Sequence, residues 1–339
     1  MHHLADSARI NKKTGRKSKY LRCFPSKPTL VGKPEKGQVV TNETEQNRTK
    51  LSKVSCSVIG GVFNLALNQF PNTVRIETTN ACNAKCVICP HRKMQRPVGY
   101  MDDALYNRII DECAEYNCDD VHLHNFGEPL LDKHIAQRVR YAKRKGVKRV
   151  TIFSNGSLLT ADKANELMDA GLDEIKISFD GATEEEFERI RLGLKFDTVA
   201  ANIKELVKIR DLKKFPLKIK VACHSTSDKG KTMQSLENCV DEFCFGKVHN
   251  WADFEINHAA KSKIRKPCSR VWRTFTVLSN GKAALCCIDY EGKVVLGDVN
   301  KASIFEIWNN KSYKEMRLLH RTAQQDQITI CKNCTKSFW

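Results

Sequence analysis

The chain has 339 residues, of which 41% are hydrophobic and 28% charged, a composition typical of a folded globular protein. Its most apolar stretch, residues 54–67, is interrupted by serines, glycines and an asparagine and is too short to cross the roughly 30 Å hydrocarbon core of a bilayer. Length and composition therefore argue against a disordered or membrane-spanning protein and allow one large α/β domain with a smaller appendage.

The formal net charge of +18 is unevenly distributed along the chain. Residues 1–50 hold twelve Lys and Arg residues against four Asp and Glu residues, together with three prolines and no apolar periodicity. This pattern is typical of a flexible basic extension, although an arm that binds nucleic acid or an acidic partner is the alternative. Residues 51–71 are expected to form a helical segment that leads into the main domain.

The sequence contains fifteen cysteines, and the basic N-terminus is not followed by the apolar core of a signal peptide. We therefore expect a reducing, cytoplasmic environment, in which clustered cysteines bind metals more often than they form disulfides.

From residue 72 to about residue 260, short β-branched runs alternate with helical patterns, which indicates repeated βα units around a parallel sheet. Asp102 is expected to cap one of the helices, and Thr160 and Gly171 to bound another. The six predicted strands are residues 73–79, 120–126, 149–155, 174–180, 217–224 and 247–254. A partial (β/α)6 barrel or an open α/β sheet would accommodate them.

Unusual residues follow the first four predicted strands, where the carboxyl ends of parallel strands gather functional groups at one edge. In chain order they are Cys82, Cys86 and Cys89; Gly127, Glu128 and Pro129; Ser154 and Asn155; and Ser178. Taken singly, the later groups are equally well explained as turns or helix caps. By strand alternation Lys220 and His224 would face the same cavity, although a buried or solvent-satisfied role is the simpler expectation for each.

The three clustered cysteines fit on a single loop, and thiolates are the usual ligands of iron-sulfur clusters. Three ligands would leave one iron of a [4Fe-4S] cluster open to an external ligand. The alternative is a zinc site completed by a residue such as His91, since tetrahedral zinc accepts three cysteines and one histidine.

After about residue 260 the βα pattern stops, and residues 261–339 carry a second cysteine group. A hairpin is expected around Asn280 and Gly281, and one helix is expected around residues 304–320. The cysteines of this group are Cys268, Cys286, Cys331 and Cys334, with Cys287 as an alternative to Cys286. A zinc site with four cysteine ligands is the other interpretation of this group.

The CxxxCxxC spacing after the first of six βα units resembles that of the radical S-adenosylmethionine (SAM) superfamily. The resemblance covers roughly residues 72–255 of the expected core domain, residues 72–260. The resemblance implies that Cys82, Cys86 and Cys89 hold a [4Fe-4S] cluster that binds SAM. Gly127, Glu128 and Pro129 resemble the motif that binds the SAM amino group, with Phe126 in place of its first glycine. By the same resemblance the remaining SAM-binding residues are Ile88, Ser154, Asn155, Ser178 and Arg191.

The C-terminal cysteine spacing is similar to that of the SPASM/twitch extension of this superfamily, but the segment has fewer cysteines than a full SPASM domain. The resemblance implies one auxiliary [4Fe-4S] cluster held by Cys268, Cys286, Cys331 and Cys334. The expected architecture is therefore an α/β fold, a partial (β/α)6 barrel with a small C-terminal iron-sulfur domain.

The resemblance further implies reductive cleavage of SAM to a 5′-deoxyadenosyl radical, which abstracts hydrogen from a substrate. The leading expectation is an oxidoreductase that oxidises a carbohydrate-like or aminocyclitol alcohol and receives electrons from flavodoxin or ferredoxin. A peptide-modifying maturase or epimerase is the second expectation. A zinc- or cluster-stabilised nucleic-acid-binding protein is the alternative from another class, although such a protein would not need Glu128, Ser178 and six βα units in register.

Overall fold

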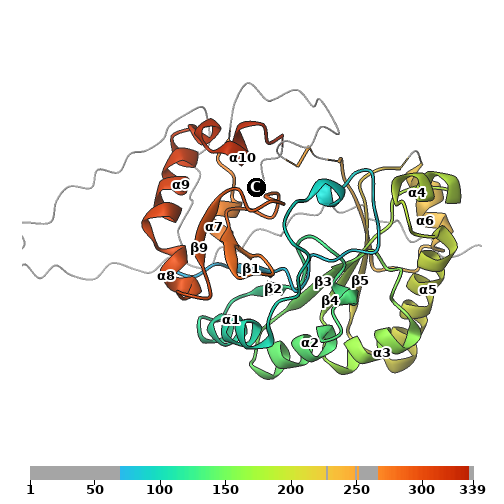
Figure 1. Cartoon of the computed structure of the whole chain (residues 1–339). Coiled ribbons are helices and arrows are strands. Elements are labelled where there is room, and N and C mark those ends of the chain that lie inside the picture. Colours follow the sequence, from blue (N-terminus) through green and yellow to red (C-terminus); the bar gives the residue numbers. More distant parts are fainter. Residues whose placement is uncertain (1–68, 227, 249, 252–265, 336–339) are drawn as a thin grey trace, which may run out of the picture. The chain divides into compact units, whose positions relative to one another are not determined.

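A computed structural model describes residues 69–226, 228–248, 250–251 and 266–335 (Figure 1). All of them belong to one unit, Leu51–Trp339. The predicted N-terminal extension and most of the predicted lead-in helix lie outside the described residues.

The described strands form one nine-stranded sheet in the order β6-β5-β4-β3-β2-β1-β7-β8-β9. Neighbouring strands from β1 to β6 are parallel, which confirms the predicted α/β class. β7 pairs in parallel with the free side of β1, and β8 and β9 continue the sheet in antiparallel fashion. The strands are β1 Thr73–Ile76, β2 Asp120–His122, β3 Val150–Ser154, β4 Glu174–Ser178, β5 Lys218–Cys223, β6 Glu242–Phe245, β7 Thr274–Val277, β8 Lys282–Ala284 and β9 Val295–Asp298.

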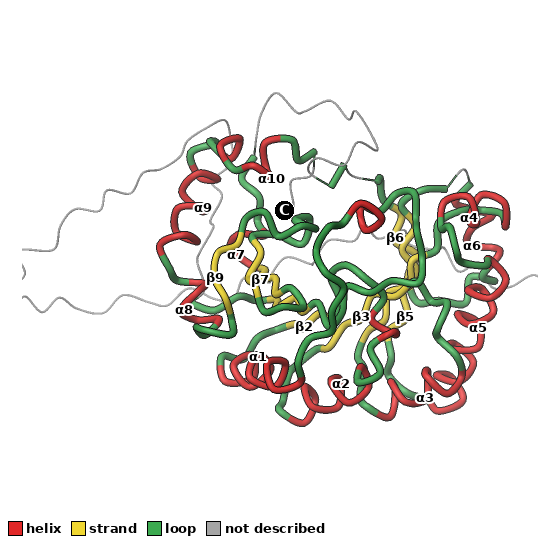
Figure 2. Tube along the Cα trace, in the orientation of Figure 1, coloured by secondary structure: helices red, strands yellow, loops and turns green. Residues whose placement is uncertain are grey.

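The helices α1, α2, α3 and α5 follow the outer side of the parallel strands, and the C-terminal elements lie beyond β1 (Figures 1 and 2). None of the described helices is both long and apolar enough to cross a membrane. The helices are α1 Asp103–Glu115, α2 Ile135–Arg144, α3 Ala161–Asp169, α4 Glu184–Ile190, α5 Phe196–Lys213, α6 Lys229–Ser235, α7 Arg270–Arg273, α8 Ile304–Trp308, α9 Lys311–Arg321 and α10 Thr329–Lys332, with short 3₁₀ turns at Pro90–Lys93, Pro129–Leu131 and Gln325–Gln327.

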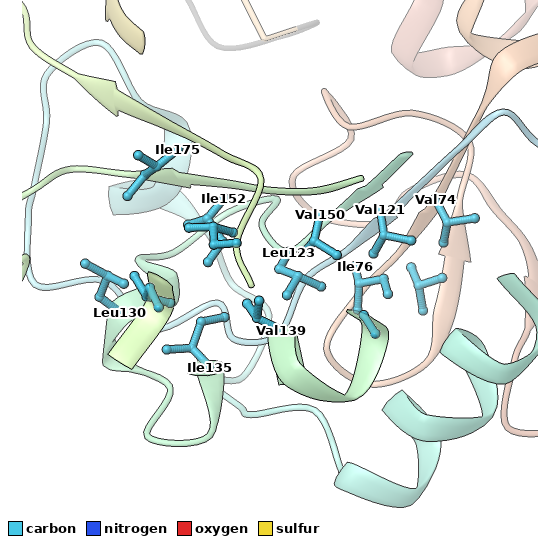
Figure 3. Close-up of a cluster of buried hydrophobic side chains, with 14 of the residues drawn as sticks. Val74, Ile76, Val121, Leu123, Leu130, Ile135, Val139, Val150, Ile152 and Ile175 are labelled. Carbon is cyan, nitrogen blue, oxygen red and sulfur yellow. The ribbon is translucent and has the colours of Figure 1, made fainter. Parts of the chain in front are cut away.

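Aliphatic side chains fill the layer between the sheet and these helices. Val74 and Ile76 of β1 lie in one cluster with Ile135 and Val139 of α2 (Figure 3). Because side chains alternate across a strand, the intervening positions face the other side of the sheet, which is the interior of the barrel. These interior positions are largely polar.

Several local predictions are confirmed. The Asp102 side chain accepts a hydrogen bond from the Leu105 amide and caps α1, and Thr160 caps α3 in the same way. β7 and β8 form the hairpin expected around Asn280 and Gly281.

Two predicted boundaries were wrong. The sixth strand is Glu242–Phe245, which pairs with β5. Lys247 and Val248 of the predicted range 247–254 have no strand structure, and residues 249 and 252–254 lie outside the described residues. A side chain at Gly246, directly after the strand, would meet the His224 ring at 2.5 Å. The single helix expected at 304–320 is two helices, α8 and α9, because Asn310 caps a new helix between them.

Candidate functional site

The loop after β1 carries the first cysteine group, and its three thiols are free. Cys86 is buried, and Cys82 and Cys89 are half-buried. Burial raises the pKa of Cys82 to about 11 and that of Cys89 to about 12, and neighbouring thiols of the group add to both shifts. The Cys82 and Cys89 thiols are therefore protonated at neutral pH until a metal binds, and ligation has to release their protons.

Two backbone hydrogen bonds hold this loop against the end of α4 and the turn that follows it, and a side-chain bond braces the loop internally. The amides of Lys85 and Val87 donate to the carbonyls of Leu192 and Ile190, over 2.8 and 2.9 Å. His91 donates from Nε2 to the Asn80 carbonyl at 2.6 Å. That bond occupies Nε2, and so the structure gives the zinc alternative no support from this nitrogen.

Gly127 is required by a close approach to the cysteine loop. It has a φ of +87°, and a Cβ there would lie 2.7 Å from the carbonyl oxygens of Ala81 and Thr79. The missing side chain lets the Glu128 amide donate to the Ala81 carbonyl at 2.7 Å. Pro129 then opens a short 3₁₀ turn. The predicted Gly-Glu-Pro segment thus fixes the start of the cysteine loop.

Glu128 is buried and joins the ends of β2 and β3. Its Oε1 accepts hydrogen bonds from Ser154 Oγ at 2.8 Å and from the Leu130 amide at 3.0 Å, and its Oε2 accepts from the Asn155 amide at 2.6 Å. Burial raises the pKa of Glu128, while these three donors oppose the shift. The structure thus brings together three of the residues predicted to bind SAM.

Asn83 lies between the first two cysteines and was not singled out from the sequence. Its Oδ1 accepts from Asn155 Nδ2 at 2.9 Å, and its Nδ2 donates to Ser157 Oγ at 2.9 Å. These contacts tie the cysteine loop to the end of β3. Its position inside the cysteine motif was the only available signal, because its partners lie more than 70 residues away.

Arg191 approaches the cysteine loop from the end of α4. Its guanidinium forms a buried ion pair with Asp180 and lies 3.8 Å from Cys86 Sγ through Nη1. Burial disfavours the charge on Arg191, but Asp180 and Cys86 outweigh burial and raise its pKa. Asp180 in turn accepts from the His224 and Ser225 amides, at 2.5 and 2.8 Å.

Two further predicted residues lie nearby. Ser178 ends β4, is half-buried and stands opposite Ala222 of β5. Ile88 is half-buried beside the third cysteine, and its carbonyl accepts a hydrogen bond from Trp251 Nε1 at 2.8 Å.

The second cysteine group gathers around Arg270, a half-buried arginine at the start of α7. Burial lowers the pKa of Arg270, but the thiols of Cys287, Cys286, Cys268 and Cys334 outweigh burial and raise it. The thiols of Cys286 and Cys287 are hydrogen bonded to each other, so both remain candidates for one ligand position.

His320 of α9 connects the first and third predicted ligands of this group. Its Nδ1 accepts from the Cys268 amide at 3.3 Å, which leaves the ring proton on Nε2, 3.7 Å from Cys331 Sγ. The sequence offered no signal for His320, because it lies 52 residues from Cys268.

Both groups have the donor chemistry of iron-sulfur sites, with three thiols on one loop and further thiols around Arg270. Among the described residues, no three His, Cys, Asp or Glu side chains are yet arranged around a common metal position.

Comparisons with known proteins agree with this arrangement. A model of the radical SAM superfamily matches residues 76–214, and a model of an iron-sulfur cluster-binding domain, SPASM, matches residues 268–335. The S-adenosyl-L-methionine-dependent 2-deoxy-scyllo-inosamine dehydrogenase of Niallia circulans is 22% identical over 267 residues, 77% of this chain and 91% of that protein. A probable GTP 3′,8-cyclase of Methanopyrus kandleri is 37% identical over 116 residues, 34% of this chain and 36% of that protein.

Two solved structures share the fold. The structure of BtrN in complex with AdoMet and 2-DOIA matches with a TM-score of 0.56 and 20% sequence identity. The match covers 78% of this chain and 93% of the BtrN chain. Streptococcus suis SuiB bound to the precursor peptide SuiA has a TM-score of 0.62 at 13% identity, over 74% of this chain and 67% of that chain. The two matched domains imply SAM, a SAM-binding [4Fe-4S] cluster and auxiliary cluster binding. This chain belongs to the radical SAM superfamily and carries a C-terminal SPASM-type iron-sulfur domain.

Proposed function

We propose that this radical SAM enzyme is an oxidoreductase that converts an alcohol carbon of a carbohydrate-like small molecule to a carbonyl. The observation that carries the proposal is the hydrogen-bonded network at the sheet edge, in which Glu128, Asn155 and Asn83 join the cysteine loop to the ends of β2 and β3. The similarity to a dehydrogenase over 91% of that protein's length supports the reaction type.

In this proposal Cys82, Cys86 and Cys89 hold the SAM-binding cluster within the core domain, residues 72–260. Cys268, Cys286, Cys331 and Cys334 hold an auxiliary cluster within residues 261–339. When bound, the first cluster and SAM supply a radical able to remove hydrogen from an unactivated carbon, which no protein side chain does unaided.

The chain's own residues hold and orient SAM. A carboxylate offers about four lone-pair sites, and described donors fill three of those on Glu128, which leaves one for the SAM ammonium group. Gly127 and Pro129 place that carboxylate, and Ser154 and Asn155 keep it fixed. Arg191 supplies a positive charge near Cys86 for the SAM carboxylate, and Ile88 and Ser178 border the adenosine.

Oxidation of an alcohol carbon to a carbonyl removes one hydrogen atom, one proton and one electron. The C-terminal cysteine group suits the electron, because it would form a second redox site in the domain whose strands β7, β8 and β9 continue the sheet from β1. We infer that flavodoxin or ferredoxin supplies the reducing electron for SAM cleavage and that the enzyme works in a reducing compartment such as the cytoplasm.

A peptide substrate is the second candidate, because the fold is shared with SuiB, whose structure contains a precursor peptide. One experiment tests both. The anaerobically reconstituted full chain is incubated with SAM, dithionite and panels of sugars and peptides, and 5′-deoxyadenosine and substrate mass are measured. We expect SAM cleavage and a product two hydrogens lighter than a sugar-class substrate. No cleavage above a Cys82→Ala, Cys86→Ala, Cys89→Ala control would refute the radical SAM assignment, and a modified peptide would replace the substrate class.

A further inference from the structure

Two cationic side chains, Arg75 and Lys176, lie near the Phe153 ring in the interior of the barrel. The Arg75 guanidinium of β1 lies 5.9 Å from the centroid of the Phe153 ring, and Lys176 Nζ of β4 lies 4.9 Å from it. The His124 ring stacks on the same phenyl ring, with centroids 3.8 Å apart. Phe153 stands opposite Lys176 in the register of β3 and β4.

Neither cation forms an ion pair with an acidic side chain in the described part of the chain. Lys220, which stands opposite Lys176 on β5, is different. Its Nζ lies 2.9 Å from Glu174 and 3.5 Å from Glu242. Among the described residues, Lys220 therefore has two carboxylate partners, whereas the neighbouring Lys176 has none.

Arg75 is held by two neutral imidazoles. Its Nη2 lies 3.2 Å from His122 Nδ1, and its Nη1 lies 2.6 Å from His124 Nε2. Arginine only donates, so both ring nitrogens accept. His122 Nε2 then carries a proton and donates to Asp120 at 2.9 Å. Burial lowers the pKa of both histidines, so neither ring adds or removes charge at neutral pH.

Burial lowers the pKa of Arg75, and the negative charges of Cys287, Cys286 and Asp120 oppose this shift without cancelling it. The Asp120 carboxylate also accepts from Arg149 at 2.6 Å and from Thr151 at 3.1 Å. The chain from Asp120 through His122 and Arg75 to His124 therefore leaves the ring proton of His124 on Nδ1. That nitrogen and Arg75 Nε are buried, and neither has a hydrogen-bond partner among the described residues.

We propose that the barrel interior binds an oxyanion, a carboxylate or phosphate group of the substrate, with Lys176 and Arg75 as its counter-charges and His124 Nδ1–H as a hydrogen-bond donor. The assignment of this anion to the substrate rests on the proposed function. An anion with several acceptor oxygens matches what the site lacks, because it supplies negative charge and hydrogen-bond acceptors at once.

A positively charged site in the barrel interior limits the class of substrate that can bind. An amine is a cation at neutral pH, and two unbalanced positive charges oppose its binding. The substrate is therefore a sugar acid or sugar phosphate rather than the aminocyclitol expected from the sequence. The basic site lies deeper than the predicted SAM site, since Lys176 precedes the strand-ending Ser178 by one inward-facing step on β4.

The test is equilibrium dialysis of the reconstituted full chain, loaded with SAM, against labelled inorganic phosphate and labelled gluconate, with glucose as the neutral probe. We expect phosphate, gluconate or both to bind, and glucose to bind at least tenfold more weakly. Phosphate alone indicates a phosphate ester, and gluconate alone indicates a carboxylate. Lys176→Met should weaken anion binding at least tenfold. Lys204→Met should not weaken anion binding, because it removes the same charge from Lys204 of α5, whose partner in an exposed ion pair is Glu237.

Arg75→Gln provides a second variant with the same expected loss, and circular dichroism checks that each variant is folded. The inference is overturned if neither anion binds the wild-type enzyme, or if Lys176→Met binds anions as well as Lys204→Met does. It is also overturned if Lys176→Met weakens SAM binding tenfold in the absence of any anion probe, because the cations would then serve the SAM carboxylate. Anion binding does not require turnover. If the wild-type enzyme did not cleave SAM, the proposed function would be refuted, but the dialysis experiment would still show whether the site binds an anion.

Discussion

Glu77 and Arg96 form a bidentate ion pair between the end of β1 and the C-terminal part of the cysteine loop, with nitrogen–oxygen distances of 2.9 and 3.0 Å. Glu77 is fully buried and also accepts from the Ser279 amide at 3.1 Å, in the hairpin between β7 and β8. Arg96 Nε donates to the Tyr290 carbonyl at 2.7 Å. One carboxylate therefore joins the loop of the first cysteine group to the domain that carries the second.

Glu77→Gln should destabilise the protein strongly, because it leaves Arg96 buried without its counter-charge. Removing one partner of a buried ion pair costs about 3–5 kcal/mol. The measurement is the free energy of unfolding in urea. Glu237→Gln is the matched control, because it breaks the exposed pair with Lys204 and should cost about 0–1 kcal/mol. Equal effects of the two substitutions would contradict the coupling role of Glu77.

The iron content tests the two cysteine groups separately. Anaerobic reconstitution should give about eight irons per chain, and Cys82→Ala, Cys86→Ala and Cys89→Ala together should leave about four. Cys239→Ala is the control, because this half-buried cysteine lies outside both groups and its loss should leave iron unchanged. Stoichiometric zinc without sulfide in the wild type would support the zinc alternative instead.

Glu128→Ala should weaken SAM binding while the first cluster still assembles. The carboxylate would lose a charge-assisted contact to the SAM ammonium, worth about 1.5–3 kcal/mol, or roughly tenfold to a hundredfold in affinity. Ser154→Ala is the comparison, since it removes one donor to Glu128 but keeps the carboxylate, and its effect should be smaller. Equal SAM affinity in wild type and Glu128→Ala would mean that the segment is only a structural turn.

The sequence predicted the elements with strong local patterns. The first five strands and the caps of α1 and α3 depend on hydrophobic alternation and on capping side chains that lie within a few residues. The β6 boundary was missed because a four-residue run with two phenylalanines gives a weaker pattern than the residues after it, and pairing with β5 decides the outcome.

The site residues were predictable where a spaced motif carries them, and unpredictable where a contact joins distant parts of the chain. The spacing of the first cysteine group and the position of Glu128 at a strand end were visible in the sequence. The link from Glu77 to Ser279 spans 202 residues, and that from His320 to Cys268 spans 52. A single carboxylate or histidine with no periodic partner cannot be distinguished from a surface residue until the fold brings its partner to it.

Loss of the C-terminal cysteines should affect an oxidation differently from a redox-neutral reaction. Cys331→Ala combined with Cys334→Ala removes two predicted ligands from α10 and the residues after it, far in sequence from the first cysteine group. If this domain accepts the electron left by substrate oxidation, the variant should still make 5′-deoxyadenosine but yield no oxidised product. Metal binding and local folding are coupled, so iron content and a thermal melt must accompany the assay. His320→Gln is the matched variant, because it keeps every thiol and removes only the imidazole beside Cys331. It should retain about eight irons and measurable product. Full product yield from the double cysteine variant, with only about four irons bound, would rule out the electron-acceptor role and favour a redox-neutral reaction.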